Sequence, residues 1–432
     1  MQYQNLKKVM IAGVSLFSMS SAYASNTNPD TVNDVSNSQT NWAETRARLN
    51  ANLDSVSENV TATAAAISNS FSAELGGKSV VNNVQTTGLD RAGRPVADRD
   101  PVAQLNLNAT DQVGSITGTA AAIGNSASVT IDGTVAGGNP TSRISNRQRT
   151  FTSSYSDLNA DVSGVDDLVE VTSAAINNSF SADVSGRSNV NNFQDSWRNS
   201  RSDLNLKAND TVGSIAATSA AIGNSASIKT ETADGANYIN SLQMTHRGRF
   251  NSNLTLEGKN VNAGDAADNA ISATSASIAN SLSVEGTGSL TANNRQYFIG
   301  DSQAKSDIDL DDIYGSVEST TAALGNSASF DITDAEYVSI NNHQSSAYDP
   351  TATANVNIGD INGDVAITSA GIANSLSVST LPSTAALDVT SVQENSAFTG
   401  AYVDASLGGV IGNAELTAAA IGNSVSISNL TN

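Results

Sequence analysis

The chain has 432 residues, with 42 acidic and 21 basic side chains, a formal net charge of −21 and no cysteine. This charge argues against nucleic acid or an anionic lipid surface as partner, because phosphates are bound by lysine and arginine. Without cysteine there are no disulfides to compensate for a small core. Aromatic residues make up only 5% of the chain, so a conventional core of large side chains is not expected.

Residues 1–24 have the parts of a secretory signal peptide. Lys7 and Lys8 form a basic start, an apolar stretch follows, and an A-x-A cleavage site ends at Ala24. The mature protein is therefore predicted to start near Ser25 and to be secreted. No other apolar run approaches the ~18–20 residues of a membrane helix, so direct membrane insertion is not expected.

Residues 25–432 form one domain built from a repeated phrase. The pattern A-x-[IL]-x-N-S-x-S occurs eight times, with its asparagines 46–56 residues apart. Repetition at a fixed period is the signature of a stacked repeat architecture. The asparagines of the eight copies are Asn69, Asn125, Asn178, Asn224, Asn280, Asn326, Asn374 and Asn423.

A second phrase, of the form [VIA]-x-[NS]-x-Q, precedes each copy of the first. In six of the eight repeats, 30 residues separate its glutamine from the next repeated asparagine. We expect repeats at about 32–78, 79–140, 141–187, 188–236, 237–288, 289–336, 337–386 and 387–432. The glutamines are Gln39, Gln85, Gln148, Gln194, Gln243, Gln296, Gln344 and Gln393.

Apolar and polar residues alternate in both phrases, which is typical of β-strands, whose successive side chains point to opposite faces. In residues 119–129 this places Ala121, Ile123, Asn125 and Ala127 on one face, which we predict to be the inner one. A buried lone amide is costly. If the repeats stack, equivalent amides lie about 4.8 Å apart and bond as a ladder.

The predicted fold is therefore an all-β solenoid of eight repeats of about 46–56 residues with internal Asn and Gln ladders. Each repeat forms either one wide coil or two narrow ones, giving a rod of roughly 40 or 80 Å at ~4.8 Å per coil. An antiparallel sandwich is the alternative, but it would not require an inward amide in every unit.

The GNSA phrases at 124–127, 223–226 and 325–328 are similar to the strand–turn–strand unit of curlins. There, a turn containing Gly and Asn precedes Ala and alternating apolar residues. The chain also resembles the secreted holdfast-anchor proteins of surface-attaching bacteria in length and mixed repeat design. The resemblance implies an outer-surface fibre or anchor subunit with a role in adhesion and biofilm formation.

No catalytic constellation is evident, so we do not expect an enzyme. His246 and His343 lie in different repeats, and the serines follow the strand pattern without an acid–base partner. No cofactor is expected apart from calcium, for which carboxylates supply hard oxygen ligands. The calcium candidates are Asp309, Asp311, Asp360 and Asp364, although solvated turns also account for them.

Arginine and aromatic residues recur shortly after the repeated glutamine, among them Arg149, Trp197, Arg198 and Tyr297. If the repeats stack, these residues form a stripe along the solenoid. One interpretation is a structural ladder of cation–π contacts. The other is a face that binds polysaccharide or a partner protein.

The leading hypothesis is a non-enzymatic structural or adhesive protein of the bacterial surface. Its partners would be further copies of itself, in a fibre, or another surface-anchor protein, bound by edge pairing of strands at the open ends. The alternative is a module that binds polysaccharide or a partner through the Arg/aromatic stripe. A calcium-stabilised adhesin and an ice-binding protein are less favoured.

Overall fold

The computed structural model describes residues 21–24, 32–90, 92–96, 99–133, 141–262, 270–381 and 386–429. The side chains of 21–24, 233–235, 262 and 270 are not among those described. In the described part, all pairings between named strands are parallel, which rules out the antiparallel sandwich and confirms the predicted β-solenoid.

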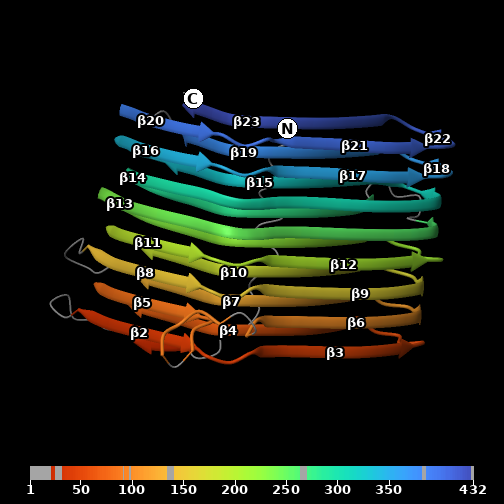
Figure 1. Cartoon of the computed structure of the whole chain (residues 1–432), viewed down its shortest axis with the longest axis horizontal. Coiled ribbons are helices and arrows are strands. Elements are labelled where there is room, and N and C mark those ends of the chain that lie inside the picture. Colours follow the sequence, from red (N-terminus) through yellow and green to blue (C-terminus); the bar gives the residue numbers. More distant parts are fainter. Residues whose placement is uncertain are drawn as a thin grey trace.

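Each repeat forms one wide coil, and the described residues build eight coils that stack in chain order (Figure 1). A coil has two outer strands and a longer return strand. The first outer strands are β2 (Asn33–Asn41), β5 (Ser79–Thr87), β8 (Ser142–Thr150), β11 (Ser188–Ser196), β16 (Tyr337–Ser346) and β20 (Ala386–Asn395). The second are β3 (Thr45–Asp54), β6 (Pro101–Gln112), β9 (Ser154–Val165), β12 (Ser200–Asn209), β17 (Pro350–Ile358) with β18 (Ile361–Asn362), and β21 (Gly400–Leu407) with β22 (Val410–Ile411).

The return strands are β4 (Val60–Gly76), β7 (Ile116–Asp132), β10 (Val169–Ser185), β15 (Ser316–Thr333), β19 (Val365–Leu381) and β23 (Ala414–Asn429). Two long strands, β13 (Ile215–Asn262) and β14 (Ala270–Tyr314), each supply the return strand of one coil and both outer strands of the next. Of the predicted signal peptide, residues 1–20 lie outside the described part. Ser21–Ala24 form β1, which pairs with β4.

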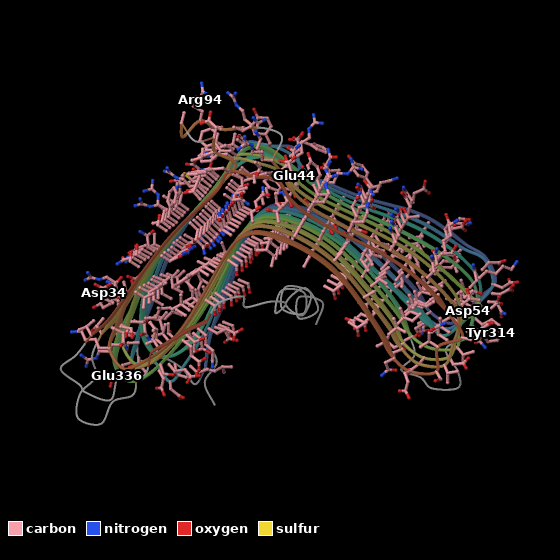
Figure 2. All side chains as sticks on the ribbon, turned by 90° about the horizontal axis from the view of Figure 1, so that it is seen from below. Asp34, Glu44, Asp54, Arg94, Tyr314 and Glu336 are labelled. Carbon is pink, nitrogen blue, oxygen red and sulfur yellow. The ribbon has the colours of Figure 1, made fainter. Side chains whose placement is uncertain are left out.

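In cross-section the stack is an arch of two limbs that meet at an elbow (Figure 2). The outer layer runs from Asp34 past Glu44 at the elbow to Asp54, and the return strands form the inner, concave layer. We call the limb with the first outer strands the amide limb and the other the leucine limb. One 17-residue return strand measures about 56 Å along its bent course at ~3.3 Å per residue, whereas eight coils stack to only about 38 Å. The protein is therefore broader than it is tall, unlike the predicted rod.

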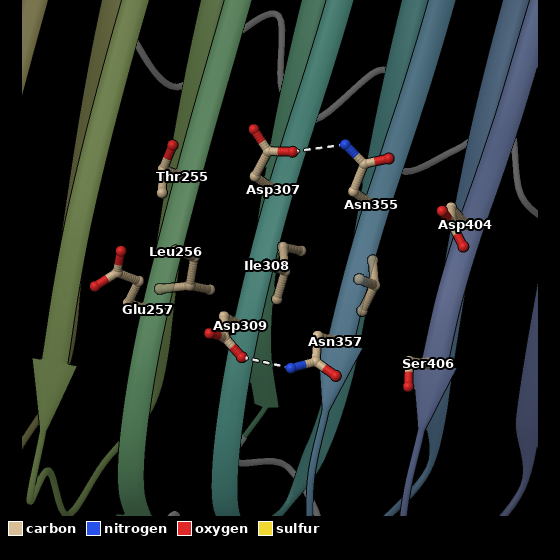
Figure 3. A pocket seen from close by; sticks show the side chains of 11 residues that line it. Thr255, Leu256, Glu257, Asp307, Ile308, Asp309, Asn355, Asn357, Asp404 and Ser406 are labelled. Atoms are coloured by element: carbon tan, nitrogen blue, oxygen red, sulfur yellow. Dashed lines mark hydrogen bonds between the residues drawn. The ribbon is translucent and has the colours of Figure 1, made fainter.

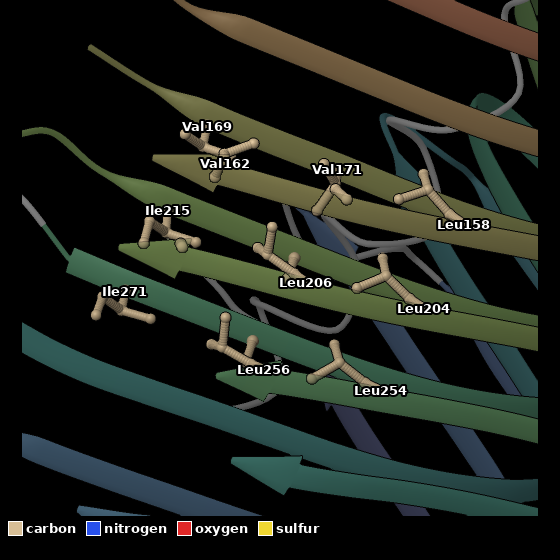
Figure 4. Close-up of a cluster of buried hydrophobic side chains, with 14 of the residues drawn as sticks. Leu158, Val162, Val169, Val171, Leu204, Leu206, Ile215, Leu254, Leu256 and Ile271 are labelled. Carbon is tan, nitrogen blue, oxygen red and sulfur yellow. The ribbon is translucent and has the colours of Figure 1, made fainter. Parts of the chain in front are cut away.

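The two limbs have separate apolar cores. In the leucine limb, equivalent residues such as Leu158, Leu204 and Leu254 stack from coil to coil against Val171 and Ile215 of the return strands (Figure 4). In the amide limb the core contains one column in which large and small residues alternate. Alternation of this kind fills a stack without voids or clashes. The column is Phe71, Ala127, Phe180, Ala226, Leu282, Ala328, Leu376 and Val425.

The return strand changes phase at the elbow, and there the predicted inner face is partly wrong. Ala120 and Ala122 face the leucine core, whereas Asn125 and Ala127 face the interior of the amide limb. The strand pairs keep the same register on both sides of this place, but Gly124 and its equivalents in the other coils have no partner in the pairing between Ile123 and Asn125. The strand bends at this residue, and the face that its side chains occupy changes there.

Because of this phase change, the isoleucine of the repeated phrase lies on the concave side of the elbow, together with the alanine two positions before it. In the C-terminal half of the stack these positions form a small cluster of their own, separate from both cores: Ile278, Ala322, Leu324 and Ile372, with the partly buried Ile222 and Ile421. Ile123 is nevertheless only 3% exposed.

Candidate functional site

A ladder of asparagine side chains crosses all eight coils at the elbow. Each Nδ2 donates to Oδ1 of the equivalent asparagine in the next coil, from Asn69 to Asn423, over 2.7–2.8 Å. The seven asparagines from Asn69 to Asn374 are 0–6% exposed. The predicted buried ladder is thus present, and its hydrogen bonds all point toward the C-terminal coil.

A ladder of glutamine side chains runs beside it in the opposite direction. Each Nε2 donates to Oε1 of the preceding coil, from Gln393 back to Gln39, over 2.7–2.9 Å. The two ends of the stack therefore differ. At the C-terminal end the asparagine ladder ends in a donor and the glutamine ladder in an acceptor, and at the N-terminal end the roles are reversed.

The second N–H of each ladder amide connects the two layers of the solenoid. Asn125 Nδ2 donates to the Arg149 carbonyl at 2.9 Å, and Gln148 Nε2 donates to the Ser179 carbonyl at 2.7 Å. An unmade hydrogen bond of a buried group costs about 1–3 kcal/mol, so these bonds hold the register along the stack and the spacing between layers together.

A third ladder, at the central position of the [VIA]-x-[NS]-x-Q phrase, is interrupted where serine replaces asparagine. Asn83 donates to Asn146, and Asn146 to Asn192, at 2.7 and 2.8 Å. At Ser241 the incoming bond lengthens to 3.3 Å, and in the described structure Oδ1 of Asn294 in the following coil has no hydrogen-bond partner. A serine is too short to span the step.

The structure brings part of the predicted Arg/aromatic stripe together on the outer side of the elbow. Trp197 stacks on His246 with ring centroids 4.3 Å apart, and its Nε1 donates to Asp195 Oδ2 at 2.9 Å. Arg149 lies 4.0 Å from the same Asp195 oxygen. Arg198 is exposed, and its carbonyl accepts a bond from a buried amide at 3.0 Å.

Tyr297 does not join that group. Its hydroxyl lies 3.2 Å from Nδ1 of His343, in the neighbouring coil on the C-terminal side. His246, by contrast, is 3.3 Å from Asp195. The two histidines therefore belong to separate clusters, each with an aromatic neighbour.

Phe193 and Arg147 are functional candidates that the sequence analysis missed. They occupy the position just before the repeated glutamine, on the outer face of the amide limb. The guanidinium carbons of Arg147 and Arg149 lie 5.6 and 5.4 Å from the Phe193 ring centre, within cation–π range. The period-two pattern of the sequence already predicts that this column points outward.

The four calcium candidates lie on the outer face and turns of the leucine limb. Asp309 accepts a bond from Asn357 at 2.8 Å, Asp311 pairs with Lys259 at 3.4 Å, and Asp364 accepts from the Asn413 backbone at 2.8 Å. The backbone carbonyl of Asp360 accepts a hydrogen bond from the Ile313 N–H at 2.9 Å. Among the described residues there is no group of three or more His, Cys, Asp or Glu placed to hold a metal, and calcium stays a prediction.

A left-handed backbone explains the frequent aspartates at the far turn of the leucine limb. Asp111, Asp210 and Asp312 have φ of 52°, 50° and 56° there. Asp and Asn tolerate this conformation better than other residues with a side chain. The recurrence of acidic residues at this turn thus has a backbone cause.

The outer face of the leucine limb carries a shallow acidic groove. Asp307 and Asp309 of β14 line it, and Asn355 and Asn357 of β17 donate to them at 2.7 and 2.8 Å (Figure 3). In an adjacent part of this face, burial and the charge of Asp203 raise the pKa of Asp157. The outer face of the leucine limb therefore carries several carboxylates close together.

Comparison with known protein families identifies the family of this chain. The model of one family, holdfast attachment protein D, matches residues 163–432, more than half of the chain. The chain belongs to the holdfast attachment protein D family. No curated protein and no solved structure matches the chain, and the comparisons do not confirm the likeness to curlins.

As a member of the holdfast attachment protein D family, the protein has a role in surface attachment. It is a protein of the cell surface. Within the part of the chain that the structure describes, no helix is long and apolar enough to cross a membrane.

Proposed function

We propose that this protein is an anchor subunit that assembles head to tail, with the last coil of one copy against the first coil of the next. The observation that carries the proposal is the state of the two end coils, where both amide ladders end without a further partner in the described structure. The edges of β20, β21, β22 and β23 are open at the C-terminal end, and those of β2 and β3 are open at the N-terminal end, where β1 covers only Ser72–Leu75 of β4. Exposed strand edges readily pair with another chain.

Core positions that are closed in the middle of the stack are open at its C-terminal end. Ala127 and Val129 of β7 are 2% and 1% exposed, whereas Val425 and Ile427, which occupy the corresponding positions of β23, are 48% and 49% exposed. Such an apolar surface is typical of an interaction site. A further coil would bury it.

The polarity of the ladders selects a head-to-tail contact. At the C-terminal end, Asn423 has an unused Nδ2 hydrogen and Gln393 an unused Oε1; at the N-terminal end, Asn69 offers Oδ1 and Gln39 offers Nε2. Donor therefore meets acceptor in both ladders only when unlike ends join. Two like ends would place acceptor against acceptor and donor against donor.

The two end coils also match in length. The same 30 residues separate Gln39 from Asn69 and Gln393 from Asn423. Both ladders, and the strands that carry them, can therefore continue in register across the contact. Strict register favours a single mode of addition.

Two variants with one blocked end each test the proposal. Val425→Lys puts a charge on the C-terminal end and Phe71→Lys puts one on the N-terminal end, while Ser227→Lys adds the same charge to an exposed position in the middle of the stack. The assay is light scattering after size exclusion, with electron microscopy of the particles. The wild type and Ser227→Lys should elongate with concentration, and each end variant should stay monomeric.

A mixture of the two end variants gives the sharper result. Each retains one open end, and these are complementary, so the mixture should form dimers and nothing larger. A wild type that is monomeric at every concentration, elongation of Val425→Lys, or dimers of a single end variant would each refute head-to-tail assembly.

A further inference from the structure

The outer face of the amide limb differs from the rest of this acidic protein. A groove of about 510 Å³ runs along the stack axis over β8, β11, β13 and β14. Among its lining side chains are Arg147 and Arg295, and no carboxylate. In the described structure neither guanidinium belongs to an ion pair with an acidic side chain. A cationic groove on a chain of net charge −21 favours an anionic ligand.

An apolar patch lies between the two arginines. Arg147, Phe193, Leu242 and Arg295 are consecutive partners in neighbouring coils. At ~4.8 Å per coil, the two arginine positions are about 14 Å apart along the stack. The groove thus offers an aromatic and an aliphatic side chain at its centre and a positive charge at each end.

A row of exposed amides borders the patch. Asn293 donates to Asn240, and Asn240 donates to Asn191, each at 3.0 Å. The carboxamide nitrogen has two hydrogens, so each of these donors keeps one N–H for a ligand. The row presents donors and acceptors at the repeat distance of the coils, next to the apolar patch.

We propose that this groove binds a polysaccharide that carries carboxylates, with the sugar chain lying across the strands. The arginines would pair with the carboxylates, for which a guanidinium fork is the matching donor. Phe193 and Leu242 would contact the apolar faces of the sugar rings, and the asparagine row would bond to hydroxyl groups. This combination of an apolar lining with a few placed polar groups is typical of ligand sites.

The acidic groove of the leucine limb would repel the same polymer, because Glu257, Asp307 and Asp309 line it. Binding is therefore confined to one limb. The groove lies within a single chain, so binding does not depend on the assembly proposed above, and its failure would leave that proposal standing.

Binding to immobilised polymers at low ionic strength tests the site. The double variant Arg147→Gln/Arg295→Gln removes both groove charges, and the control Arg201→Gln/Lys207→Gln removes two charges from the outer face of the leucine limb. The wild type should bind polygalacturonate and not dextran. The groove variant should bind at least about tenfold more weakly, because it lacks both of the charged donors that would pair with the carboxylates. The control should bind like the wild type.

Three results would overturn the proposal. Absence of polygalacturonate binding by the wild type would do so, as would an equal loss in both double variants, which would mean unspecific charge attraction. Binding of poly-glutamate as tight as that of polygalacturonate would indicate an acidic protein as the partner. The outward variant Phe193→Ala distinguishes a sugar chain from an acidic protein. It should weaken binding of polygalacturonate, whose sugar rings would contact the phenyl ring, and should leave binding of poly-glutamate unchanged. Circular dichroism of each variant establishes that the fold is intact.

Discussion

Replacement of one buried ladder amide should destabilise the whole stack. Asn224 is 0% exposed, accepts from Asn178 at 2.8 Å, and donates to Asn280 and to the Met244 carbonyl, both at 2.8 Å. Asn224→Leu keeps the approximate volume and leaves three buried groups without this partner. At about 1–3 kcal/mol for each of the three groups, we expect a loss of about 3–9 kcal/mol in the free energy of unfolding.

The matched control is Asn240→Leu. Asn240 belongs to a ladder of the same geometry, but on the exposed outer face, where water replaces the lost bonds. Its effect should stay within about 0.5 kcal/mol. The measurement is urea unfolding of both variants, followed by far-UV circular dichroism.

The position in the stack gives a second comparison. Asn423 is the last member of the buried ladder and is exposed, so Asn423→Leu should cost clearly less than Asn224→Leu. Equal losses for Asn224→Leu and Asn240→Leu would refute the reasoning, because burial of the amides would then not be what makes the ladder matter.

Two further predictions concern the amide core and the acidic limb. Phe180→Ala should lower the free energy of unfolding by about 3–5 kcal/mol, because its stacked neighbours are alanines that cannot fill the cavity. The outward variant Phe193→Ala should lower it by less than about 1 kcal/mol. Thermal unfolding measures both, and equal losses would contradict the assignment of Phe180 to the core. The pKa of Asp157 is raised above 3.8 by burial and by Asp203, so the folded state holds its proton more tightly than the unfolded state, and stability falls as pH rises through this window. Asp157→Asn should therefore raise stability at neutral pH by up to about 1 kcal/mol and give no such gain near pH 3, as urea unfolding at both pH values would show; a loss at neutral pH would contradict it.

The ladders were predictable because their evidence is in the sequence itself. An amide such as Asn125 amid apolar positions is costly alone and satisfied only by its copies, so repetition and chemistry lead to the same answer. The outward column with Phe193 and Arg147 was predictable by the same alternation, once every outward position is considered.

The phase change at the elbow could not be predicted in this way. Ala121 and Ile123 are apolar, so a strict period of two assigns them to the core, and nothing in the phrase shows that the concave side of a bend also excludes water. Gly124 marks the bend only once the structure is known. A Cβ there would lie 2.6 Å from the Asn177 carbonyl, but the adjacent coil has an asparagine at the equivalent place, so glycine is not required at this position in every coil. The coil width was hidden too, because one wide coil and two narrow ones have the same alternation.

The bend and the ladders are mechanically linked. Where the return strand changes phase, each coil has polar backbone and side-chain groups in its interior that neither core can satisfy. The Asn and Gln side chains occupy that place, with one N–H directed along the stack and the other across it, as for Asn125 and Gln148. Stacking therefore completes the hydrogen bonds of the ladder amides in every coil except the first and the last. The same requirement that fixes the register inside one chain leaves both ends with unmade amide bonds, which is why a protein built this way favours addition of another coil of its own kind.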